Sequence, residues 1–73
     1  MGVVRTKVTI EVIDHEETGA VVRRARKEAG LSLRDVADNT GLSTAYISNL
    51  ETGNRPWTDN LFDVVMAAIM ELA

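Results

Sequence analysis

The sequence predicts a mostly α-helical domain, a bundle of four helices preceded by one β-strand. The chain has 73 residues, which allows one hydrophobic core and leaves no room for a second. From residue 18 onward, apolar side chains recur at helical spacing in four segments separated by glycine, proline and capping residues. A period of two, with Val4, Thr6, Val8, Ile10 and Val12 on one side, occurs only over 3–13. We therefore expect an N-terminal strand with an acidic connector (1–17) and a helical domain (18–73).

The predicted strand needs a partner from outside its own chain. Its apolar side alternates with charged and polar residues, and no second strand pattern follows it. A lone strand is not stable in water. We expect it to pair with the same strand of a second copy, antiparallel about a two-fold axis at Val8, which places Arg5 opposite Glu11. The dimer strand would contain Arg5, Val8, Ile10 and Glu11.

Two helices are predicted over the next segment of the chain. The first begins after the acidic connector 14–17, has an apolar stripe and ends at Gly30. Ser32 is placed to cap the second helix, with Asp35 at the third helical position as a short form of the capping box. The second helix should end at 40–41. The inward residues of the two helices are expected to be Val21, Val22, Ala25, Ala29, Leu33, Val36 and Ala37.

Two further helices complete the predicted bundle. Ser43 should cap the third helix, and the segment 52–54 should end it. Pro56 separates the third helix from the fourth, which Thr58 or Asp59 should cap, and Trp57 should pack under the fourth helix. The inward residues are expected to be Leu42, Ile47, Leu50, Leu61, Val64, Val65, Ala68, Ile69 and Leu72.

Composition and charge limit the classes of function. The chain contains no cysteine, which excludes disulfides, thiol chemistry and cysteine-type zinc sites. No segment has the length of a membrane span or the pattern of a signal peptide, so we expect a cytoplasmic protein. No nucleophile and base pair, glycine-rich phosphate loop or metal-ligand spacing is present. His15, the single histidine, lies in the connector, where we expect it to be exposed. We expect no enzyme activity, no metal and no cofactor.

The net charge is −3, but the central part of the chain is basic. Residues 18–56 carry six Lys or Arg against four Asp or Glu, whereas residues 1–17 carry two against four and residues 57–73 carry none against three. The basic residues therefore gather in the segment that contains the motif described next. Such a distribution permits a nucleic-acid partner.

Residues 33–52, LRDVADNTGLSTAYISNLET, have the spacing of a helix-turn-helix. Ala37 is small enough for two helices to cross closely, and Gly41 permits the left-handed backbone of a short turn. Leu42, Ile47 and Leu50 then supply the apolar wedge that fixes the second helix across the first. Each of these elements is common, but five in register are specific.

The segment 23–56, RRARKEAGLSLRDVADNTGLSTAYISNLETGNRP, resembles the Cro and phage-repressor type of helix-turn-helix, also called the xenobiotic-response-element type. The resemblance covers roughly half of the chain. It implies a repressor-like bundle whose third helix reads bases in the major groove, and a structural pair between Arg26 and Glu51. Two departures stand out. Leu33 occupies a position that is glutamine in many members, and the fifth helix on which relatives often dimerise is not expected here.

The outward face of the third helix should carry the base contacts. Inward-facing Ile47 and Leu50 leave Thr44, Ala45, Ser48 and Asn49 outward. Asn49 is the strongest candidate, because its amide can bind adenine bidentately. We expect phosphate contacts from Arg34, Tyr46, Asn54 and Arg55, with Arg23 and Lys27 close to the DNA backbone.

These features favour a regulator of transcription, a repressor or autoregulator that binds double-stranded DNA as a homodimer on a palindromic operator. The alternative is an antitoxin-like or other module whose N-terminal strand holds a protein partner. In a third interpretation, the N-terminal segment is an arm that reaches the DNA. The sequence does not point to a membrane partner.

Overall fold

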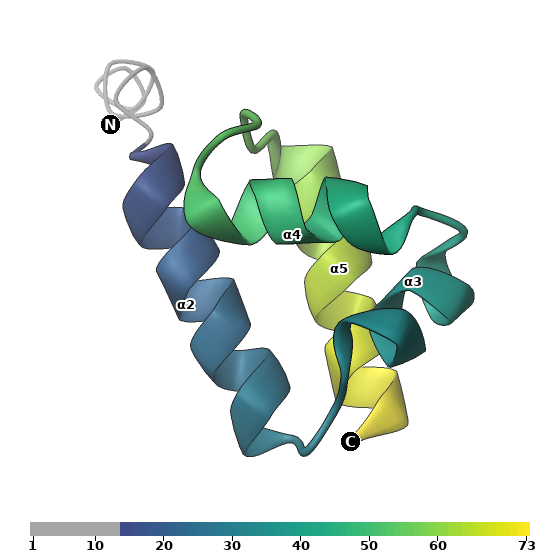
Figure 1. Cartoon of the computed structure of the whole chain (residues 1–73). Coiled ribbons are helices and arrows are strands. Elements are labelled where there is room, and N and C mark those ends of the chain that lie inside the picture. The colour runs from purple at the N-terminus through teal and green to yellow at the C-terminus, as the bar shows by residue number, and fades with distance from the viewer. Residues whose placement is uncertain (1–13) are drawn as a thin grey trace, which may run out of the picture.

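The computed structural model describes residues 14–73, which form four helices (Figure 1). They are α2 (His15–Glu28), α3 (Leu33–Thr40), α4 (Thr44–Thr52) and α5 (Asp59–Leu72). Helix α4 lies across the N-terminal half of α2 and also contacts α3, while α5 packs against α2 and α3. The predicted mostly helical, four-helix arrangement is confirmed for this part of the chain. The strand predicted over 3–13, with Arg5, Val8, Ile10 and Glu11, lies outside the described residues.

Every helix contributes to one hydrophobic core. The largest side chains that are fully buried are Val22 of α2, Val36 of α3, Ile47 and Leu50 of α4, and Val65 of α5. Burying a side chain of this size stabilises a fold by about 1.5–3 kcal/mol. Two of the five belong to the nine-residue helix α4, so α4 is firmly seated by one face and its opposite face is left outward.

The start of α3 is fixed by the predicted capping box. The Ser32 hydroxyl accepts a hydrogen bond from the Asp35 backbone N–H at 3.0 Å, and the Asp35 carboxylate accepts one from the Ser32 N–H at 2.8 Å. The bond from the Ser32 backbone N–H, and after it the interaction of the Ser32 side chain with the same carboxylate, lower the pKa of Asp35 below its ordinary value. The box therefore stabilises the fold at neutral pH, and this contribution is lost as the pH falls through the lowered pKa.

The turn between α3 and α4 has the predicted geometry. Gly41 ends α3 with φ at 79°, in the left-handed region that glycine adopts without a steric cost. Ser43 then starts α4, its hydroxyl accepting from the Tyr46 N–H at 3.0 Å. Farther along the chain, Thr58 and not Asp59 is the cap of α5. The local signals in the sequence thus place three of the four helix starts correctly.

The fourth start, that of α2, differs from the prediction. The helix begins at His15, so most of the supposed acidic connector is helical. The Asp14 carboxylate accepts from the Glu17 N–H at 3.0 Å and caps the helix. Glu16 and Glu17 lie in the first turn, where negative charge is favoured by the helix dipole. His15 is half-buried, and the prediction that it is exposed was wrong.

Three residues predicted to face inward are exposed. Val21 is 43% exposed, Val64 40% and Leu72 39%. Val21 and Val64 lie at the margins of their apolar stripes, and the neighbouring Val22 and Val65 occupy the core instead. Leu72 is the last residue of α5, one turn beyond the packed segment. Within residues 14–73, no helix is long and apolar enough to cross a membrane.

Candidate nucleic-acid interface

Helix α4 presents a polar face opposite its buried one. The four residues predicted to contact bases lie on this helix, with Thr44 and Ala45 exposed and Ser48 and Asn49 half-buried. Ile47 and Leu50, on the opposite side of the same helix, are fully buried. The first turn carries no acidic side chain. The N-terminal half of α4 is therefore open to a ligand and bears no charge that would repel a phosphate.

The α3–α4 turn sets the direction in which α4 projects. Ala37 is 6% exposed and belongs to the core, so a larger residue there would force the packed helices apart. Leu42 packs against the same core. The Thr40 hydroxyl donates to the Val36 carbonyl at 2.8 Å and accepts from the Leu42 N–H at 3.3 Å. The sequence did not predict these two contacts. These contacts hold α4 in one orientation relative to α3.

Arg26 of α2 and Glu51 of α4 form a buried ion pair. Arg26 Nε donates to Glu51 Oε2 at 2.8 Å and Nη2 donates to Oε1 at 3.0 Å, so the pair is bidentate. A third bond runs from Arg26 Nη1 to the Leu31 carbonyl at 2.8 Å. The two side chains are 8% and 4% exposed. Arg26 thus joins α2, the α2–α3 turn and the end of α4, and its guanidinium is not free to contact DNA.

The loop after α4 is tied to both α4 and α2. The Asn49 carbonyl accepts from the Asn54 N–H at 2.9 Å and the Arg55 N–H at 3.2 Å. Trp57 is buried, its ring N–H donates to the Leu50 carbonyl at 2.9 Å, and its backbone N–H donates to His15 Nδ1 at 2.9 Å. The predicted packing of Trp57 against α5 is an edge-on contact with Phe62, ring centroids 6.2 Å apart.

The predicted phosphate contacts lie on α3, on α4 itself and on the loop after α4. Arg34, Asn54 and Arg55 are exposed and Tyr46 is half-buried. Arg34, in the first turn of α3, approaches Asp38 at 3.9 Å, but both side chains are more than 70% exposed. A pair this open to solvent contributes little to stability, so Arg34 stays available. Arg55 lies over the Tyr46 ring, with Cζ 5.6 Å from the ring centroid.

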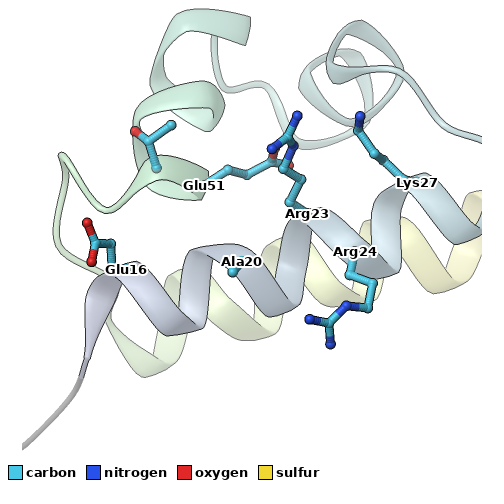
Figure 2. Close-up of a pocket in the computed structure, with 7 residues that line it drawn as sticks. Glu16, Ala20, Arg23, Arg24, Lys27 and Glu51 are labelled. Atoms are coloured by element: carbon cyan, nitrogen blue, oxygen red, sulfur yellow. The ribbon is translucent and has the colours of Figure 1, made fainter.

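A basic hollow borders α4 on the side of α2 (Figure 2). Figure 2 shows Arg23 and Lys27 pointing toward the side of Glu51, whereas Arg24 points the other way. The Glu51 carboxylate is already paired with Arg26, so it offers little charge to the hollow. The hollow is lined by Glu16, Ala20, Arg23, Arg24, Lys27, Glu51 and Thr52.

The motif and its geometry define a helix-turn-helix protein, and the chain belongs to the helix-turn-helix domain family, which residues 17–68 match. It is 33% identical over 54 residues to the transcriptional regulator ClgR of Mycobacterium tuberculosis, in strains CDC 1551 / Oshkosh and ATCC 25618 / H37Rv. That match covers 74% of this chain and 48% of ClgR. The chain thus spans about half the length of the curated relatives it matches. No solved structure matches it.

Proposed function

We propose that the chain binds double-stranded DNA sequence-specifically and regulates transcription, with α4 in the major groove. The observation that carries this proposal is the outward face of α4, polar and uncharged, on a helix seated by Ile47 and Leu50. A major groove admits one α-helix and displays a distinct donor and acceptor pattern for each base pair. The similarity to a protein named a transcriptional regulator supports the same function.

Each contact residue has a role that follows from its side chain. Asn49 can bind an adenine through its amide oxygen and nitrogen, and Ser48 can bond to several base edges. Thr44 and Ala45 offer methyl groups to thymine. Phosphates would be held by Arg34, Tyr46, Asn54 and Arg55, and by Arg23 and Lys27 in the basic hollow.

Within this function we favour the Cro and phage-repressor type, acting as a cytoplasmic repressor or autoregulator. The Arg26–Glu51 pair that the resemblance implies is present in the structure, which supports the assignment to this type. A repressor acts by occupying its operator, which needs no catalytic group. The site accordingly requires no metal or cofactor.

Asn49→Ala is expected to weaken binding to the operator by about 1–3 kcal/mol and to leave binding to random DNA nearly unchanged, because a base contact carries the sequence information. The operator is first obtained by selecting bound duplexes from a random pool with the wild-type protein. Affinities are then measured at several salt concentrations. A plot of the logarithm of the binding constant against the logarithm of the salt concentration should have a slope of roughly −0.9 per phosphate contacted.

Asn60→Ala is the matched control, because Asn60 is an exposed asparagine on α5. This variant should bind both operator DNA and random DNA as tightly as wild type. Equal losses of Asn49→Ala on operator and random DNA would remove Asn49 from base reading. If the wild-type protein bound no duplex, or bound DNA with an affinity that did not depend on salt, the proposed function itself would be wrong.

We propose further that the protein is a homodimer joined through residues 3–13 and that its operator is palindromic. In the predicted pairing about Val8, Arg5→Glu would face Glu11 of the second copy and repel it. We expect this variant to shift the mass in sedimentation toward the monomer. The double variant Arg5→Glu with Glu11→Arg should recover the dimer. A dimer unaffected by the single change would reject this pairing.

A further inference from the structure

The backbone of Arg55 is fixed relative to α4. Its N–H donates to the Asn49 carbonyl at 3.2 Å, next to the 2.9 Å bond from Asn54. Two residues later, the buried Trp57 ring N–H binds the Leu50 carbonyl. Both sides of Arg55 are therefore anchored to the last two turns of the helix. The side chain of Arg55 starts from a defined point beside Asn49.

The side chain of Arg55 is held by an aromatic ring. Its Cζ lies 5.6 Å from the centroid of Tyr46, within the ~6 Å range in which a cation is attracted to a ring face. Tyr46 is half-buried and packs against the hydrophobic core, so the ring is a rigid support. Arg55 is exposed and has no ion-pair partner among residues 14–73. The guanidinium therefore lies over the ring and stays open to solvent.

We propose that Tyr46 is a positioning residue, whose ring holds the Arg55 guanidinium beside Asn49 to bind a phosphate of the DNA backbone. This inference rests on the proposed function and deepens it. Tyr46 and Asn49 are three residues apart on α4 and hence neighbours on its surface. The supported cation therefore lies next to the side chain that reads a base.

Phosphate is the ligand that suits this arrangement. The planar guanidinium matches the oxygens of a phosphodiester bidentately. An arginine already ordered on a ring loses less side-chain freedom on binding than a free one. The sequence predicts that Tyr46 contacts phosphate through its own hydroxyl. In the arrangement proposed here the ring acts through Arg55, and the hydroxyl is dispensable.

Two substitutions of Tyr46 separate the ring from the hydroxyl. Affinities of the full chain are measured for a short mixed-sequence duplex, because a phosphate contact does not depend on sequence. Tyr46→Phe keeps the ring and should bind within about two-fold of wild type. Tyr46→Leu removes it and should bind about two- to five-fold more weakly, the value of an exposed cation–ring contact. Arg55→Ala removes one phosphate contact, so the dependence of log affinity on log salt concentration should become less steep by about 0.9.

The double variant tests whether Tyr46 acts through Arg55. In the Arg55→Ala background, Tyr46→Leu should cause no further loss, since its effect requires the guanidinium. Additive losses would overturn the proposal, as would equal losses for Tyr46→Phe and Tyr46→Leu. Arg55→Lys is a second variant that leaves the core untouched. Lysine keeps the positive charge but lacks the planar guanidinium group, so this variant should bind the duplex less tightly than wild type. Unchanged binding would contradict the proposal.

The free protein gives a readout independent of DNA. In NMR spectra, the Cδ protons of Arg55 should be shifted upfield by the ring in wild type and in Tyr46→Phe, and not in Tyr46→Leu. Absence of this shift from wild type would overturn the support of Arg55 by Tyr46. Presence of the shift in a protein that binds no duplex would instead overturn the proposed function, and the phosphate role with it.

Discussion

Glu51→Ala is expected to lower the free energy of unfolding by about 3–5 kcal/mol, because it leaves the Arg26 guanidinium buried without its counter-charge. The two side chains are only 8% and 4% exposed, so solvent cannot replace the lost carboxylate. For a domain of this size, each kcal/mol changes Tm by about 4–8 °C. We therefore expect thermal unfolding, followed by circular dichroism, to show a fall in Tm of more than about 12 °C.

A double variant distinguishes an unpaired charge from lost packing. Arg26→Met with Glu51→Met removes both charges and keeps apolar volume at both sites, and such replacements of buried pairs are often neutral. It should recover most of the stability lost in Glu51→Ala. Recovery should be incomplete, since the Leu31 carbonyl loses the bond from Arg26 Nη1. A double variant less stable than Glu51→Ala would show that the ion pair itself, and not the cost of isolating a charge, stabilises the fold.

Local chemistry made the α3–α4 unit predictable. Ser32, Asp35 and Ser43 can satisfy the free N–H groups of a helix start only in one register. Gly41 then marks the position in the α3–α4 turn where the backbone turns left-handed. Because Ile47 and Leu50 define the inward side of α4, the outward side follows from helical periodicity. These signals act within a few residues of each other, which is why a single sequence contains them.

The start of α2 was predictable from the spacing of two acidic residues in the supposed connector. Asp14 and Glu17 have the three-residue spacing of a capping box, and the Asp14 carboxylate does accept from the Glu17 N–H. Acidic residues at a helix start resemble a solvated linker in composition. Their spacing, and not their charge, separates the two cases.

Contacts between distant segments could not be derived from the sequence. Arg26 and Glu51 are 25 positions apart, and no local pattern pairs them; only the resemblance to a known family implied that they meet. His15 and Trp57 are 42 positions apart. The support of Arg55 by Tyr46 depends on how the loop folds back onto the Asn49 carbonyl. Such contacts follow from how α2, α4 and the loop after α4 pack together, which no local sequence pattern specifies.

Gly19 is the residue whose role was least visible, and Gly19→Ala is expected to destabilise the protein by about 3 kcal/mol, the upper end of overpacking costs. At an exposed helical site the same change would stabilise by about 1 kcal/mol. Here a methyl group would meet the backbone carbonyls of Leu50 and Glu51, the former at 2.5 Å. Backbone atoms cannot rotate away as a side chain can, so α4 must move from α2.

The sign of the change is therefore the test, measured by urea denaturation. The control is Ala20→Gly, at the exposed neighbouring position of the same helix, which should cost only the propensity difference of about 1 kcal/mol. A stabilising Gly19→Ala would show that α2 and α4 are less tightly packed than described. Because the colliding carbonyls belong to the last turn of α4, the displacement also moves Asn49 and its anchored loop. DNA affinity should fall in Gly19→Ala even at temperatures where the variant is folded.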